Sequence, residues 1–357
     1  MVAARRAESV IFYLTIAGAG GPAESSLQRS RLIVLIAGLL LALPGWAARP
    51  EGLYSAEVEY EGNQQAAFEA ALGEVLVKLT GRRDAAARAE VQPLIASAAD
   101  YVQQFRSPSP GLLWVSFDGN SLAARLTELG QPVWGGERPS TLLWLAVDAG
   151  GGRRFVVASE AEAADEARLR QAAVDEAERR GLPLVLPLVD AEDRARAPFS
   201  ELWGGFDDAI LEASRRYGVD AVLVGRLAAG DFDRGRWTLL AGDTAERWTG
   251  GVADSIGRVA DAFASRYAVV STGESGAIRL VVSGVESVED YGRISSFLGD
   301  LTAVQALHLE TVQADRIVYR VSLRGDAAVL DQAVRLGGLL EVDGPGSPTL
   351  LSYRVRR

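Results

Sequence analysis

Side chains that commonly carry catalysis or bind metals are scarce in this sequence. Its 357 residues include no cysteine, one histidine (His308) and one lysine (Lys78). Disulfides, thiol nucleophiles and thiolate metal sites are therefore excluded, and so is a multi-histidine metal centre. His308 could serve as a general base, but it stands in a strand-like stretch where we expect it to face solvent. Lys78 falls near the end of a predicted helix, where its charge stabilises the helix dipole.

Carboxylates are abundant, so acid–base catalysis stays open. The clusters nearest predicted strand ends are Glu201, Asp207 with Asp208, and Asp231 with Asp233. Binding sites of α/β sheets form at such ends, and two converging acids could hydrolyse a bond. The segment 231–235 is faintly similar to a calcium loop but lacks the terminal glutamate, so a hairpin turn is predicted. Glycine-rich phosphate loops and a nucleophile elbow are absent from the sequence, and we expect no cofactor and no metal.

The most distinctive stretch is 129–148, which holds Trp134, Arg138 and Trp144. Tryptophan and arginine dominate protein interfaces, so these residues could form a partner or ligand surface. The competing interpretation is structural. In that case Trp134 packs a domain junction, Arg138 makes a buried ion pair, and Trp144 enters a buried strand.

The periodicity of the first part predicts an α+β domain. Residues 53–60 alternate as in a strand, and the apolar positions of 64–79 form one helical stripe between Asn63 and Gly81. A second helix is predicted over roughly 85–105, a strand over 112–117 and a short helix over 121–129.

The next part predicts a parallel α/β sheet. The apolar stretches 141–147, 183–189 and 220–227 are typical of buried strands, and helical patterns at 159–180 and 201–217 separate them. Two antiparallel strands, 236–240 and 246–249, and a helix over 252–269 complete this unit.

The small polar stretch 271–276 predicts a linker, and a compact unit follows it. Its expected order is strand 278–285, helix 287–299, strands 304–311 and 316–323, helix 326–336, and a last strand at 339–342 or 350–355. This βαββαβ order is the ferredoxin-like arrangement.

The predicted fold class is thus mixed α/β and α+β, with tandem small domains and a ferredoxin-like unit at the C-terminus. We expect a leader and signal peptide over 1–48, an α+β domain over 49–140, an α/β domain over 141–271 and the βαββαβ domain over 277–357.

Residues 29–48 have the three parts of a secretory signal. Arg29 and Arg31 precede the apolar run 32–43, and a small-residue exit ends at Ala47 or Ala48. The run is shorter than the ~20 residues that span a bilayer, although an uncleaved anchor is the alternative. Residues 1–28 are long for a leader, so we expect translation to begin near Leu27.

Several motifs resemble the bacterial family called domain of unknown function 2066. They are Val75-Leu-Val-Lys-Leu-Thr-Gly81, Val115-Ser-Phe-Asp118 and Pro132-Val-Trp-Gly135, followed by Leu143-Trp-Leu145. The resemblance implies an exported protein of Gram-negative bacteria, with no catalytic residues to carry over.

The formal net charge of −10 repels nucleic acids and anionic lipid surfaces. The lack of cofactor motifs, the single histidine and lysine, and the tandem of small domains lead us to expect a periplasmic protein that binds an envelope protein without catalysis, with membrane contact only through an uncleaved signal. The alternatives are a periplasmic carboxylate-based hydrolase and an accessory subunit anchored in the inner membrane.

Overall fold

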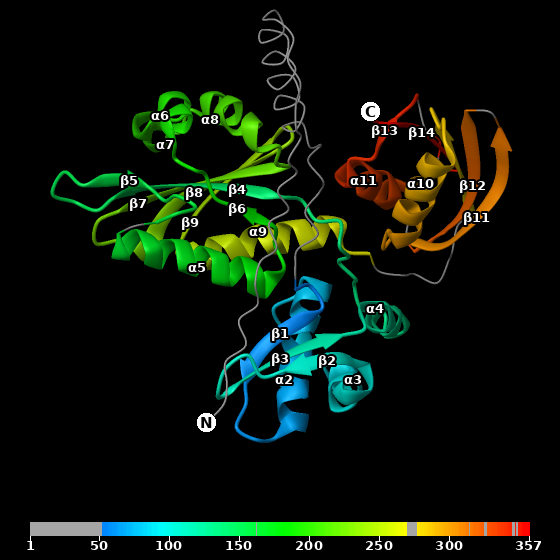
Figure 1. Cartoon of the computed structure of the whole chain (residues 1–357). Coiled ribbons are helices and arrows are strands. Elements are labelled where there is room, and N and C mark those ends of the chain that lie inside the picture. The colour runs from blue at the N-terminus through cyan, green and yellow to red at the C-terminus, as the bar shows by residue number, and fades with distance from the viewer. Residues whose placement is uncertain are drawn as a thin grey trace, which may run out of the picture. The chain divides into compact units, whose positions relative to one another are not determined.

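The structure, a computed structural model, describes residues 52–161, 163–269, 277–313, 315–324, 327–344, 347 and 349–357. The predicted signal peptide and the linker 271–276 lie outside these residues. The described residues form three sheets, each with its own helices (Figure 1). This confirms the predicted fold class of mixed α/β and α+β units.

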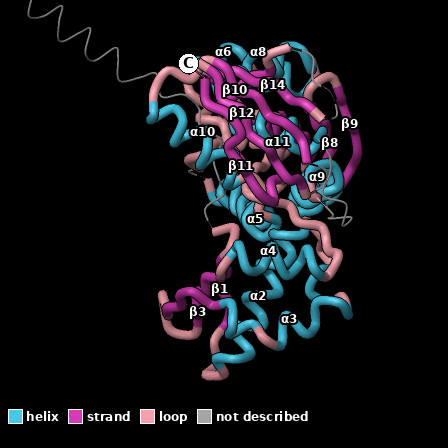
Figure 2. Tube along the Cα trace, turned by 90° about the vertical axis from the view of Figure 1, so that its right-hand side faces the viewer, coloured by secondary structure: helices cyan, strands magenta, loops and turns pink. Residues whose placement is uncertain are grey.

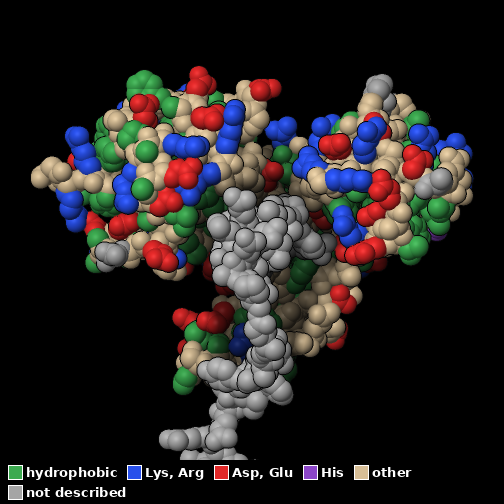
Figure 3. Space-filling model, turned by 45° about the horizontal axis from the view of Figure 1, so that its top comes forward, with side chains coloured by type: hydrophobic (Ala, Val, Ile, Leu, Met, Phe, Trp, Pro, Cys, Tyr) green, Lys and Arg blue, Asp and Glu red, His purple; other side chains and the backbone are tan. Residues whose placement is uncertain are grey.

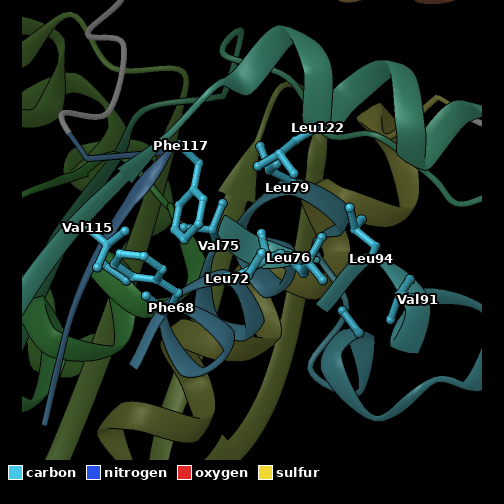
Figure 4. Close-up of a cluster of buried hydrophobic side chains, with 14 of the residues drawn as sticks. Phe68, Leu72, Val75, Leu76, Leu79, Val91, Leu94, Val115, Phe117 and Leu122 are labelled. Carbon is cyan, nitrogen blue, oxygen red and sulfur yellow. The ribbon is translucent and has the colours of Figure 1, made fainter. Parts of the chain in front are cut away.

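The first sheet is small and antiparallel, in the order β1 (Ser55–Glu59), β3 (Leu112–Phe117), β2 (Val102–Arg106). The helix α2 (Gln64–Thr80) packs on it and buries a stripe that includes Leu72 and Leu76 (Figure 4). Asn63 caps this helix by accepting a hydrogen bond from the Ala66 N–H, and Gly81 ends it in the left-handed conformation. The helix α4 (Gly119–Glu128) follows Asp118, whose side chain caps it.

The predicted long helix over 85–105 is wrong. The segment forms 3-10 turns at Ala85–Ala87, Ala89–Val91 and Ala98–Tyr101, the short helix α3 (Gln92–Ala96), and then strand β2. Pro93 is the physical reason, because it lacks an N–H and is tolerated only where a helix begins. Val91 and Leu94 are nevertheless buried, as the apolar pattern predicted.

The second sheet contains the predicted parallel core. Strand β4 (Thr141–Asp148) pairs in parallel with β6 (Leu184–Val185) and β7 (Ala221–Ala228). The strands β5 (Arg154–Val156), β8 (Gly235–Ala241) and β9 (Thr244–Gly250) join antiparallel. Strand β6 is much shorter than the predicted 183–189, because the N–H-free Pro187 and the left-handed Val189 end the pairing.

Helices cover both faces of this sheet (Figure 1). Leu143 and Leu145 of β4 pack toward α5 (Ala164–Arg180) and α9 (Val252–Tyr267). The alternate residues Leu142 and Trp144 pack toward α7 (Phe199–Gly204) and α8 (Asp207–Ser214), which follow α6 (Ala191–Arg196). The predicted single helix over 201–217 is divided, because Gly205 adopts φ 74° between α7 and α8.

The third sheet has the order β11 (Val304–Gln313), β12 (Arg316–Leu323), β10 (Ala277–Ser283), β14 (Leu350–Val355), β13 (Leu340–Val342). The helices α10 (Val288–Asp300) and α11 (Ala327–Gly337) connect its strands, so its ferredoxin-like character is confirmed (Figure 2). Both candidates for the last strand are present, and β14 lies between β13 and β10, parallel to β10. Residues 46–357 form one compact unit, so the boundaries predicted between the tandem domains stay predictions.

Candidate binding site

Trp134 and Arg138 lie where the first sheet's helix α2 meets α5 of the second. Trp134 is 0% exposed and Arg138 2%, and the guanidinium stands 4.0 Å from the centre of the indole ring. Arg138 donates from Nη2 to the carbonyls of Lys78 (2.7 Å) and Trp134 (2.6 Å), and from Nε to Gly135 (2.7 Å). Its Nη1 donates to the carbonyl of Gly181 at 2.8 Å. One side chain thus joins the ends of both helices to its own loop.

The expected buried ion pair of Arg138 is wrong, because the side chain donates its hydrogen bonds to backbone carbonyls. The carbonyls of Lys78 and Arg180 belong to the C-terminal turns of α2 and α5, where the helix dipoles are negative. Two helix ends therefore balance the guanidinium charge. Burial lowers the pKa of Arg138 to about 9, so the side chain is still charged at neutral pH.

Other charged groups at this contact also serve packing. Arg180 donates to Asp261 at 2.6 Å and to the carbonyl of Gly81 at 2.7 Å. Lys78, in the last turn of α2 as predicted, donates Nζ to the carbonyl of Ser55 at 2.7 Å, and burial lowers its pKa. Since Trp134 and Arg138 are enclosed, their side chains offer no surface to a partner.

Trp144 lies on the opposite face of the second sheet from Trp134. It is 1% exposed, and its indole N–H donates to the Ser214 hydroxyl at 2.9 Å. Its ring meets Tyr217 edge-on at 6.2 Å. It also forms part of the wall of a cavity of about 680 Å³ between β5, the segment after β6, α6 and α7.

The cavity stands at the carboxyl ends of two parallel strands. After β4 the chain crosses to α5 on one face of the sheet, and after β6 it crosses to α6–α8 on the other (Figure 1). Ligands of open α/β sheets bind in the crevice that such a switch in connection creates. The fold therefore places the cavity where binding sites usually occur.

A strained backbone borders the cavity at Val189, whose φ is 53°. Branched side chains rarely adopt this conformation, and it persists only when neighbouring groups hold it. The Leu188 N–H donates to the Tyr217 hydroxyl at 2.9 Å, and the Val189 N–H donates to Asp193 at 2.8 Å. Tyr217 in turn donates to Asp193 at 2.5 Å, and burial together with this carboxylate raises the pKa of Tyr217 to about 12.

A third group fixes the same loop. Arg216 donates from Nη1 to Asp193 and to Asp190, each at 2.9 Å. The Asp190 carboxylate also caps α6, and its hydrogen bond with Arg216 lowers the pKa of Asp190 to about 2. Asp193 and Asp190 thereby make the loop after β6 a rigid wall.

Apolar and charged side chains both line the cavity. Phe155, Val156 and Leu188 lie along it, and Leu188 is 56% exposed. The charged lining residues besides Asp193 are Arg154, Glu160, Glu166 and Arg194. The lining is thus mixed, with apolar side chains that can take up an apolar group and charged side chains that can orient it.

The structure separates the acids predicted as catalytic candidates from this cavity. Asp207 pairs with Arg247, and none of Glu201, Asp208, Asp231 and Asp233 lines the cavity. The hairpin turn predicted at 231–235 is confirmed, since β7 and β8 pair antiparallel on either side of it. His308 is exposed on β11, as predicted.

Sequence reasoning missed the acids of the cavity, Glu160, Glu166 and Asp193. Treating 183–189 as an uninterrupted strand hid the loop that carries Asp193. Pro187 followed by Asp190, a capping residue three positions before Asp193, is the signal that marks this loop. Within the residues that the structure describes, no three His, Asp or Glu side chains are grouped as metal ligands.

Comparison with known proteins corrects the family resemblance. Residues 47–135 match the family described as Domain of unknown function (DUF8605), not domain of unknown function 2066. The match spans 89 of 357 residues and ends before Arg138. No curated protein and no solved structure matches the chain. None of the described helices is long and apolar enough to cross a membrane.

Proposed function

We propose that this chain is an exported protein of the Gram-negative cell envelope that binds a partner without catalysing a reaction. The observation that carries the proposal is the cavity at the ends of β4 and β6, with its exposed apolar residue Leu188 and its fixed loop. Asp193 is the buried acid of this cavity, and its two oxygens already accept from Val189, Arg216 and Tyr217. A carboxylate engaged in this way serves the architecture of the site.

An apolar side chain of an envelope protein fits this cavity best. Leu188 is exposed, and Phe155 and Val156 of strand β5 line the same cavity. Exposed apolar groups next to a pocket are typical of surfaces that take up an anchor residue from a partner. The surrounding charges of Arg154, Glu160 and Arg194 would set the partner's orientation.

A crosslinking experiment in cells tests the proposal. A photoreactive amino acid at Leu188 should give a discrete adduct with one protein in the periplasmic fraction. Val312, an apolar residue on β11 that is 60% exposed, is the matched control position and should give no such adduct. Replacing Val156 by Trp should fill the cavity and remove the Leu188 adduct while the protein remains folded by circular dichroism. An identical pattern from both positions, or a protein found only in the cytoplasm, would contradict the proposal.

The hydrolase is the second candidate, because Glu160 and Glu166 line the same cavity. Glu166 accepts a hydrogen bond from the Ala158 N–H at 3.0 Å, which leaves its other oxygen available for chemistry. Glu160→Gln and Glu166→Gln distinguish the two candidates. A binding protein should keep the Leu188 crosslink in both variants, whereas a hydrolase should lose turnover on the trapped partner.

A further inference from the structure

Three arginines stand on one face of the second sheet. Arg226 of β7 is the direct cross-strand neighbour of Arg236 in β8, and Thr238, two residues along β8, is the neighbour of Arg247 in β9. Cross-strand neighbours carry their side chains on the same face, about 5 Å apart at Cβ, and like charges in this position destabilise a sheet. The sheet therefore holds a concentrated positive charge that needs a counter-charge.

The protein supplies only part of that counter-charge. Asp207 pairs with Arg247, whereas Arg226 and Arg236 make no ion pair within the described residues. Arg226 donates one long hydrogen bond, 3.3 Å, to Thr238, and its Nε is buried without a partner. Burial, followed by the nearby charge of Arg236, lowers the pKa of Arg226. The Arg226 Nε is enclosed, but the Arg226 Nη1 and the Arg236 guanidinium donate no hydrogen bond within the described residues.

Aromatic rings hold part of the cluster in place. Arg236 lies 5.8 Å from the centre of the Trp203 ring, and Trp203 stacks on Phe199 at 5.3 Å with 18° between the planes. Arg154 lies 5.6 Å from the centre of the Phe199 ring. Figure 3 shows basic, acidic and hydrophobic side chains mixed on the face of the molecule turned to the viewer. The two stacked rings are partly exposed and stand next to the Arg236 guanidinium.

We propose that this face binds a small phosphate-bearing molecule, with Arg226, Arg236 and Arg247 on the phosphate and Trp203 against its organic part. Guanidinium groups match phosphate oxygens with paired hydrogen bonds, and arginine also stacks on aromatic rings. The chain's net charge of −10 favours a small anion over an extended one, because a polyanion would meet the acidic remainder of the surface. The site adjoins the cavity, since Phe199 and Arg154 line the cavity wall, but Arg226, Arg236 and Arg247 do not line it.

Calorimetry on the full chain tests this site with inorganic phosphate and phenyl phosphate. Both should bind saturably, and phenyl phosphate should bind more tightly because its ring contacts Trp203. Arg236→Gln should weaken phosphate binding about tenfold, the effect of one charge-assisted hydrogen bond. Asp207→Asn should strengthen binding, because it frees Arg247 from its present partner. Arg258→Gln is the matched control. Arg258 belongs to α9, and its guanidinium likewise lies over a tryptophan, 4.9 Å from the centre of the Trp248 ring. This variant should bind phosphate as the wild type does.

Thermal unfolding separates a binding role from a structural one. Without phosphate, Arg236→Gln should raise the Tm, because it removes the repulsion with Arg226. If Arg236 had a structural role, its loss would lower the Tm.

A second titration uses vesicles of anionic phospholipid. Vesicle binding that Arg236→Gln removes supports the site and assigns the phosphate to a lipid headgroup. No binding of phosphate, phenyl phosphate or vesicles, or an equal loss in Arg258→Gln, would overturn the proposal.

Discussion

At the scale of single residues, the buried contact of Trp134 with Arg138 is a matter of stability. The indole is 0% exposed and stacks under a guanidinium that five carbonyl contacts hold in place. Because the carbonyls come from α2, α5 and the connecting loop, loss of this contact loosens two helices together. The distinctive stretch 129–148 therefore contributes through packing.

Trp134→Ala should lower the free energy of unfolding by about 3–5 kcal/mol, the cost of emptying a core tryptophan site. Urea unfolding of the full chain is the measurement. Trp134→Phe is the control, since the indole N–H has no hydrogen-bond partner within the described residues and phenylalanine keeps a ring under Arg138. It should cost much less than alanine. Equal losses of unfolding free energy in both variants would show that the stability does not depend on an aromatic ring under Arg138.

The lowered pKa of Asp190 predicts that the stability of the fold depends on pH. Its folded pKa of about 2 lies below the usual 3.8, chiefly through the hydrogen bond with Arg216, so its contribution is fully present above the unfolded value. That contribution is lost as the pH falls through the window from 3.8 to about 2. The stability difference between wild type and Asp190→Asn should accordingly be greatest near pH 6 and shrink below pH 4. Denaturant unfolding across this range measures it, and a difference that grows toward acid would contradict the assignment.

At the scale of elements, the loop from β6 to α6 stores strain. Val189 keeps φ 53° because the loop's N–H groups are held by Tyr217 and Asp193. The left-handed conformation costs a non-glycine residue about 1–2 kcal/mol, and glycine adopts it freely. Rigid strain of this kind is expected at the wall of a binding site.

Val189→Gly should therefore be more stable than Val189→Ala by about 1 kcal/mol, although glycine normally destabilises relative to alanine. Both variants lose the same branched side chain, so the difference between their unfolding free energies reports the cost of the left-handed backbone conformation. Their unfolding free energies in urea give the comparison. If alanine is the more stable of the two, the loop is not strained at this position.

The elements that the sequence predicted well are those whose signals are local. Asn63 and Gly81 bracket α2, and the apolar run 141–147 became the buried strand β4. Two errors occurred where a proline altered the pattern, at Pro93 in the predicted helix 85–105 and at Pro187 in the predicted strand 183–189, and a third where Gly205 divides the predicted helix 201–217. Apolar spacing there identified buried positions but not the type of element.

At the scale of the whole molecule, neither candidate site was predictable from one sequence. The residues that line the cavity are spread along the chain between Trp144 and Phe199. In the arginine cluster, strand register places Arg226 beside Arg236, and helix packing places Trp203 next to Arg236. Spacing along the chain does not reveal such contacts, since they depend on which strands pair. Composition did limit the chemistry, because the sequence has no cysteine and a single histidine.

The proposed export predicts the form in which the whole molecule exists in the cell. The apolar run 32–43 has 12 residues, fewer than the ~20 that span a bilayer. We therefore expect cleavage, and protein from the periplasm should begin at Ala48 or Arg49 when its N-terminus is sequenced. Replacing Ala47 and Ala48 together by Tyr should block cleavage and leave the precursor in the membrane fraction. A wild-type N-terminus upstream of Leu32 in the membrane fraction would favour the anchored accessory subunit instead.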